Sequence, residues 1–150
     1  MQYWLFKTEP DEFSIDDLKR KKEEIWDGIR NYQARNFLRD QVALGDLVFI
    51  YHSSCKEPGI VGIAKVNKTA FPDPSQFDTQ SKYYDAKATK DNPRWTSVTL
   101  EFVDKLRIIA LSKLKADKQL ESMHLVQKGS RLSIQPVTNR EWEYILNTYS

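Results

Sequence analysis

Two apolar segments on either side of a short turn constrain the fold of this chain most strongly. The first covers residues 46–53 and the second covers about 60–70, with Glu57-Pro58-Gly59 between them. The apolar residues of the first segment are nearly continuous, which is typical of a strand that is covered on both faces. Gly62 inside the second segment indicates a bulge or a close backbone approach. The pattern therefore predicts an antiparallel hairpin with its loop at 54–59.

Short helices and further strands are expected around this hairpin. Strands are predicted at 3–7, 94–108 and 131–137. Ser14 with Asp17, and Thr138 with Glu141, have the spacing of capping boxes, which predicts helices over about 15–23 and from 138 onward. Shorter helices are expected at about 32–39 and within 112–124. Four or five strands without regular strand–helix alternation favour the α+β class, with a small curved sheet or barrel.

The composition excludes several classes of protein. The 150 residues carry 23 Lys and Arg against 21 Asp and Glu, a net charge of +2, and 12% are aromatic, so the chain is not disordered. The single cysteine, Cys55, excludes an internal disulfide, and His52 and His124 are too isolated for a histidine-rich metal site. No apolar run is long enough to cross a bilayer and no signal-peptide pattern is present. We expect one domain over 1–150 that is a monomer, needs no cofactor or metal, does not enter a membrane, and is cytoplasmic, or nuclear in a eukaryote.

Tests for catalytic motifs give little. The sequence contains no phosphate-binding glycine loop and no G-x-S-x-G motif. The segment 51–55 places nucleophiles beside His52, but neighbouring strand residues point to opposite faces, so His52 and Ser53 cannot easily serve each other. An enzyme acting on a small modified nucleotide or base remains an alternative, with His52 as its candidate base.

Residues 26–37 combine aromatic, guanidinium and amide side chains, which are the groups that stack on bases, contact phosphates and bind base edges. An ordinary explanation is that Trp26 and Phe37 fill the core while the arginines lie in solvent. Residues 72–93 form a second unusual segment. This segment is polar, rich in turns and long for a loop, and such loops are usually functional or mobile.

Eight segments, in order along nearly the whole chain, resemble the EVE domain family, a PUA-like branch related to YTH domains. They are YWLFKTEPDEFS, WDGIRNYQARNFLRD, GDLVFIYHS, GIVGIAKV, FPDPSQFD, YYDAK, PRW and RLSIQPVT. The resemblance implies a small, mostly antiparallel PUA-like β-barrel with short helices around it. It also implies a pocket for a modified base of DNA or RNA, with methylated or hydroxymethylated cytosine as the leading candidates. A flipped-out base offers two faces for stacking and a polar edge for hydrogen bonds.

The resemblance also assigns roles to residues. Trp26 is expected to form a stacking wall, Asn31 to bind the base edge and Arg35 to contact phosphate. The residues expected in the base-binding pocket are Trp26, Asn31, Tyr32, Tyr51, His52, Ser53, Trp95, Arg131 and Ser133. Those expected to contact phosphate or another anion are Lys7, Arg30 and Arg35. The expected activity is non-enzymatic binding, with any effector on a separate protein. A protein-interaction module with a vestigial pocket is the other alternative.

Overall fold

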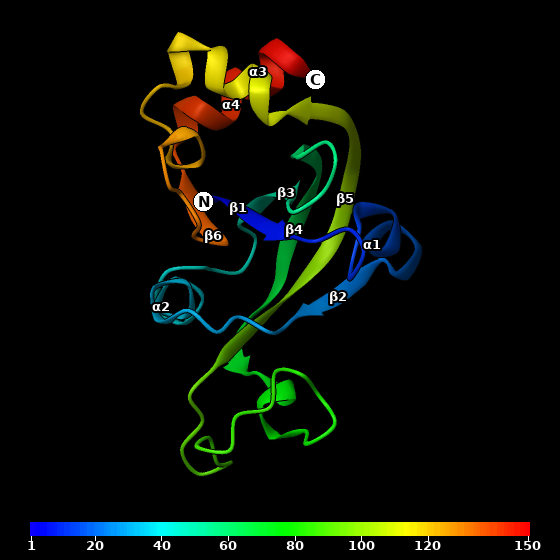
Figure 1. Ribbon diagram of the computed structural model, residues 1–150, viewed down its shortest axis with the longest axis vertical. Helices are drawn as coiled ribbons and strands as arrows, with labels where there is room; N and C mark the ends of the chain where they lie inside the picture. Colours follow the sequence, from blue (N-terminus) through cyan, green and yellow to red (C-terminus); the bar gives the residue numbers. More distant parts are fainter.

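The computed structural model describes residues 1–150 and contains a six-stranded mixed sheet with four α-helices packed around it (Figure 1). The strand order is β2-β5-β4-β3-β1-β6. The strands are β1 (Tyr3–Thr8), β2 (Glu23–Trp26), β3 (Leu47–His52), β4 (Gly59–Pro72), β5 (Thr96–Ala110) and β6 (Ile134–Val137). The α-helices are α1 (Ile15–Lys21), α2 (Tyr32–Asp40), α3 (Leu111–Ala116) and α4 (Asn139–Tyr149). Three 3₁₀ turns complete the fold, namely η1 (Pro74–Phe77), η2 (Lys118–Leu120) and η3 (His124–Val126).

The sheet is strongly curved but not closed. β1 pairs in parallel with β3, and every other pairing is antiparallel. β2 and β6 are its two edges, so the arrangement resembles a barrel without completing one. The pairing of β4 with β5 is interrupted by several register shifts, one of them at Gly62, and such bulges bend a strand and increase its twist. The predicted α+β class, the hairpin of β3 with β4 and the irregularity at Gly62 are confirmed.

Both faces of the sheet are covered, as the apolar first segment predicts. Along β3, Val48 and Ile50 belong to one core cluster, whereas Phe49 and Tyr51 belong to the other. Helices α1 and α2 contribute buried residues to the first cluster, and α3 and α4 contribute to the second. Because side chains alternate along a strand, a strand with no polar face requires this two-sided cover. None of the helices is long and apolar enough to cross a membrane.

Both capping boxes are present, at Ser14 with Asp17 and at Thr138 with Glu141. The helix predicted over 15–23 is shorter, because Lys22 at its C-cap has a φ of +73° and the chain turns directly into β2. β2 is absent from the sequence prediction. Only Ile25 and Trp26 of its four residues are apolar, and the strand is defined by its pairing with β5 rather than by a local pattern.

Candidate functional site

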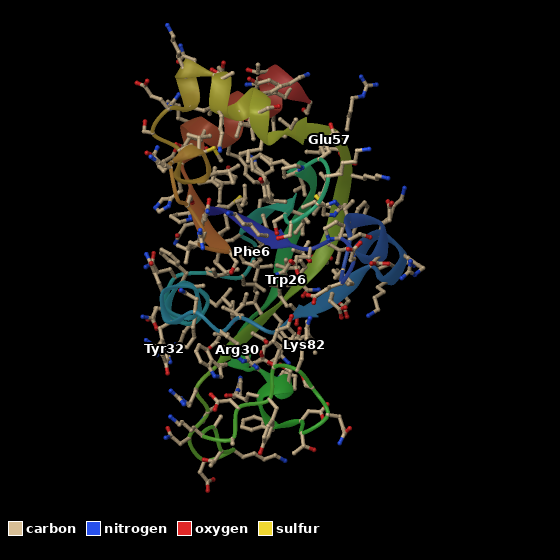
Figure 2. The ribbon with its side chains drawn as sticks, in the orientation of Figure 1. Phe6, Trp26, Arg30, Tyr32, Glu57 and Lys82 are labelled. Carbon is tan, nitrogen blue, oxygen red and sulfur yellow. The ribbon has the colours of Figure 1, made fainter.

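A cavity of about 670 Å³ opens beside Trp26, where the end of β1, strand β2 and several loops meet. A volume of this size is typical of small-molecule sites. Figure 2 shows Trp26 below Phe6 of β1, and Arg30 lower still, beside Lys82 of the segment 73–95. The lining residues are Lys7, Thr8, Glu9, Glu12, Phe13, Glu24, Ile25, Trp26, Asp27, Gly28, Ile29, Ser53, Ser54, Lys82, Tyr83, Ser130, Arg131 and Ser133.

Trp26 is both a core residue and a wall of this cavity. Its exposed fraction is 6%, and its ring centroid lies 6.0 Å from that of Phe6 and 5.9 Å from that of Phe13, the latter edge to face. These neighbours fix the indole in place, and the side chain also lines the cavity. Trp26 therefore both packs in the hydrophobic core and lines the cavity, so the two explanations of this residue do not exclude each other.

Tyr83 reaches the cavity from the segment between β4 and β5 and packs over Gly28. Gly28 has a φ of +78°, and a Cβ atom added to it would lie 2.8 Å from the Tyr83 ring. The Tyr83 hydroxyl donates a hydrogen bond of 3.3 Å to Glu12, which also forms an ion pair with Lys82. The long loop thus closes one side of the cavity through an aromatic ring seated on a glycine.

Replacing Gly28 with alanine is expected to destabilise the fold and displace the Tyr83 ring. Gly45 provides the matched control, because its φ is +88° but no atom lies within 4 Å of an added Cβ. The positive φ costs an alanine about 1 kcal/mol at either position. Urea unfolding should therefore show a larger loss for Gly28→Ala than for Gly45→Ala, with changed ring resonances of Tyr83 only in the former. Equal losses with unchanged Tyr83 resonances would contradict the packing of Tyr83 on Gly28.

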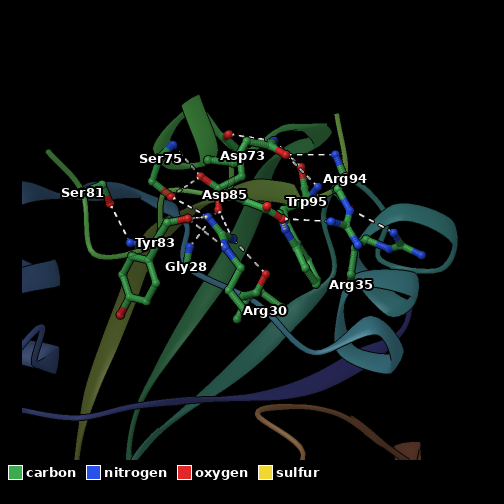
Figure 3. A network of polar contacts seen from close by, with 12 residues as sticks. Gly28, Arg30, Arg35, Asp73, Ser75, Ser81, Tyr83, Asp85, Arg94 and Trp95 are labelled. Carbon is green, nitrogen blue, oxygen red and sulfur yellow. Dashed lines mark hydrogen bonds and ion pairs between the residues drawn. The ribbon is translucent and has the colours of Figure 1, made fainter. Parts of the chain in front are cut away.

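A buried polar network holds this loop in position (Figure 3). The carboxylate of Asp73, which is fully buried, accepts hydrogen bonds of 2.8 Å from the Gly28 amide and from Nη1 of Arg30. Arg30 also donates to Oγ of Ser75 and to the carbonyl oxygen of Tyr83. Each guanidinium nitrogen of Arg30 already has an acceptor within the protein. Arg30, which the sequence predicts to contact phosphate, therefore belongs to an internal hydrogen-bond network and does not line the cavity.

Five of the predicted site residues line the cavity together. They are Lys7, Trp26, Ser53, Arg131 and Ser133. Lys7 is half-buried, and Nζ donates a 3.3 Å hydrogen bond to the carbonyl oxygen of Ser130. Burial lowers the pKa of the Lys7 ammonium below its ordinary value. No carboxylate pairs with this ammonium, so Lys7 lines the cavity as a donor without a counter-ion.

The other predicted residues lie outside the cavity lining. Asn31 caps α2, where Oδ1 accepts a 3.0 Å hydrogen bond from the Ala34 amide. Tyr32 stacks on Trp95 with ring centroids 4.8 Å apart, and the guanidinium of Arg35 lies 4.7 Å from the Tyr32 ring centroid. Trp95 is buried, and its indole N–H donates to Asp85. Tyr51 belongs to the core cluster on the other face of the sheet.

His52 is also absent from the cavity lining, because it supports helix α1. Its Nε2 accepts a 3.1 Å hydrogen bond from the Ile15 amide, which requires that nitrogen to be unprotonated. Burial lowers the pKa of the His52 imidazole, and Lys105 acts in the same direction while Asp16 opposes them. The Nε2 lone pair, which a general base would use, thus accepts a backbone hydrogen bond instead.

The lowered His52 pKa gives stability a defined dependence on pH. As the pH falls from about 6.5 towards the folded-state pKa, the unfolded chain takes up a proton that folded His52 resists, so stability decreases. His52→Gln keeps an acceptor for the Ile15 amide but cannot titrate. Urea unfolding between about pH 7.5 and pH 5 should show this His52-dependent loss only in the wild type. Parallel curves for the two proteins would contradict it.

Sequence reasoning missed the acidic side of the cavity and the aromatic residue of its loop. Four carboxylates line the cavity, from Glu9, Glu12, Glu24 and Asp27. Asp27 is exposed as a residue, yet partial burial of its carboxyl, together with the nearby Asp73 and Glu24, raises its pKa above the ordinary value. Tyr83 belongs to the YYDAK segment of the long polar loop, and this segment is the sequence signal that could have identified it. No group of three or more acidic, histidine or cysteine side chains is arranged to hold a metal ion.

The comparison with known proteins agrees with this architecture. Residues 2–148 match the EVE domain. The chain belongs to the EVE domain family. Thymocyte nuclear protein 1 of Homo sapiens is 44% identical, over 97% of this chain and 72% of that protein. The corresponding protein of Gallus gallus is also 44% identical, over 97% of this chain and 67% of its own length.

Solved structures of EVE domain relatives superpose closely. A Pseudomonas syringae protein of 56% identity has a TM-score of 0.93, with 97% of each chain covered. The human THYN1 protein has been solved in complex with DNA that contains 5-methylcytosine. That structure is 43% identical to this chain, has a TM-score of 0.92, and the match covers 98% of this chain and 96% of the other.

Proposed function

We propose that this EVE domain binds DNA that carries a modified base and holds that base in the cavity beside Trp26. Methylated or hydroxymethylated cytosine is the leading candidate. The observation that carries the proposal is the presence of this cavity in a chain 43% identical to a human protein solved with 5-methylcytosine-containing DNA. Enzymatic use of the cavity is not part of the proposal, because His52, the candidate base, supports α1 instead.

The walls of the cavity suit a planar heterocycle. Trp26, Phe13 and Tyr83 supply aromatic surface, and base–aromatic stacking contributes about 1–3 kcal/mol per base. A methyl group that meets a dry wall adds about 0.8 kcal/mol, which corresponds to about a fourfold preference over the unmodified base. Stacking therefore supplies most of the affinity, while the methyl contact supplies selectivity.

The acidic side of the cavity favours a base with an exocyclic amine. Glu24 and Asp27 lie beside the Trp26 wall, and Asp27 has no hydrogen-bond partner of its own within the chain beyond its local backbone. A carboxylate accepts a hydrogen bond from the amino group of cytosine but repels the carbonyl oxygen that thymine has at the same place.

The proposed domain acts as a monomeric reader. Its net charge of +2 supports few phosphate contacts, so its affinity for DNA depends mainly on the base in the cavity and only weakly on salt. Any chemical effect on the marked DNA then comes from a separate effector protein. RNA that carries a modified base is the alternative partner for the same cavity.

The direct experiment compares oligonucleotides that differ at one base. Fluorescence anisotropy at about 100 mM salt would measure binding of duplexes with cytosine, 5-methylcytosine, 5-hydroxymethylcytosine or thymine, and of the matching RNA. We expect the methylated or hydroxymethylated cytosine to bind about fourfold more tightly than cytosine, and thymine to bind least. Equal affinities for all four DNA duplexes would contradict the proposal.

A further inference from the structure

A second hollow, of about 370 Å³, continues from the cavity along the start of α2. Its other wall is the segment 124–132, between η3 and β6. Ser130 and Arg131 line both the cavity and this groove, so the two spaces meet at these residues. The groove is more open than the cavity and is lined almost wholly by polar residues.

The charge of the groove differs from that of the cavity. Four carboxylates line the cavity, whereas none lines the groove. Lys128 and Arg131 are exposed in the groove and take part in none of the ion pairs or side-chain hydrogen bonds of the protein. These two cations are therefore free to meet an anion from outside, and no carboxylate lines the groove itself.

The wall that presents these cations is fixed by buried contacts. Gln135 of β6 is fully buried, and its side-chain amide donates hydrogen bonds of 2.9 Å to Oγ of Ser130 and 2.8 Å to the carbonyl oxygen of Leu132. On the other side, the Lys7 amide donates to the carbonyl oxygen of Ser133 and Nζ of Lys7 donates to that of Ser130. The segment from 130 to 133 is thus tied to both β6 and β1, next to Lys128.

We propose that this groove binds the sugar-phosphate backbone of the strand whose modified base occupies the cavity, with Lys128 and Arg131 on the phosphates that flank it. This inference rests on the proposed function. A base that leaves the duplex stays bonded to its backbone, so the flanking phosphates must cross the cavity mouth. Phosphate anions are repelled by the carboxylate side of the cavity and attracted to the side without carboxylates. Arg131, at the junction, contacts the phosphate nearest the base.

The test is a salt titration of DNA binding by Lys128→Glu. Lys113→Glu makes the same change of charge on α3, which lies away from α2 in Figure 1. Affinities for the methylated and unmethylated duplexes would be measured by anisotropy across a range of salt, together with binding of the free nucleoside 5-methyl-2′-deoxycytidine. Removing one phosphate contact lowers the slope of log affinity against log salt by about 1.

We expect Lys128→Glu to weaken both duplexes by the same factor, about fivefold or more, and to lower the salt slope by about 1. It should leave nucleoside binding and the preference for the methylated duplex unchanged, and Lys113→Glu should behave as the wild type. A Lys128→Glu protein with the wild-type affinity and slope, or with a slope no lower than that of Lys113→Glu, would overturn the groove assignment. Failure of the proposed function looks different, because the wild type would then bind methylated and unmethylated duplexes equally.

Discussion

An Asp73→Ala variant is expected to lose about 3 kcal/mol or more of its unfolding free energy. The Asp73 side chain is fully buried and accepts hydrogen bonds from the Gly28 amide, from Arg30, and from both the amide and the hydroxyl of Ser75, at 2.6–2.8 Å. Its removal leaves these donors unsatisfied and leaves the Arg30 guanidinium, whose side chain is 23% exposed, without its counter-ion. Breaking a buried pair in this way costs about 3–5 kcal/mol.

The matched control for this stability measurement is Asp40→Ala. Asp40 pairs with Arg39 at 2.8 Å, but both side chains are about half exposed, at 52% and 49%. An exposed pair of this kind contributes little to stability, because water and salt screen it. Urea unfolding of the two variants should therefore separate them clearly. A loss for Asp73→Ala as small as that for Asp40→Ala would show that the network in Figure 3 does not support the fold.

The second large effect is expected on binding, from Tyr83→Ala. Tyr83 lines the cavity and forms part of its aromatic surface, yet it is not part of either core cluster. Loss of its ring should weaken binding of a duplex that contains 5-methylcytosine by about tenfold or more, since stacking on an aromatic side chain contributes about 1–3 kcal/mol. Anisotropy at fixed salt measures this loss, and a urea curve for the same sample confirms that the variant is folded.

Tyr83→Phe separates the ring from its hydroxyl group. It keeps the aromatic face but removes the 3.3 Å hydrogen bond to Glu12. We expect Tyr83→Phe to retain affinity within about twofold, because the proposed role needs only the ring. If Tyr83→Phe loses as much as Tyr83→Ala, the effect comes from the contact with Glu12. Wild-type affinity in Tyr83→Ala would remove Tyr83 from the proposed site.

Much of the fold follows from local sequence patterns. The hairpin of β3 and β4 is predicted by two apolar segments around a turn, and the starts of α1 and α4 by the capping residues Ser14 and Thr138. β2 is not predictable in this way, because Glu23–Trp26 has no strand pattern of its own and is a strand only through its pairing with β5. Local signals identify elements, but the edge of a sheet is set by the partner strand.

The cavity is harder to predict, because its walls come from distant parts of the chain. The sequence points to Trp26, which lines it, and equally to Asn31 and Tyr32, which lie just beyond it on α2. The chain turns at Gly28, and Ile29 is the last residue of this segment that lines the cavity. Tyr83 enters from a loop more than fifty residues later because Asp73 and Arg30 hold that loop in place. No rule based on residue spacing along the sequence predicts that tertiary contact.

A crystal structure of this chain with a duplex that contains a single 5-methylcytosine tests the proposed function most directly. The account predicts that the modified base has left the duplex and lies in the cavity, in contact with Trp26 and Tyr83. A modified base that stays stacked in the duplex, or that lies against the Tyr32–Trp95 stack outside the cavity, would contradict it.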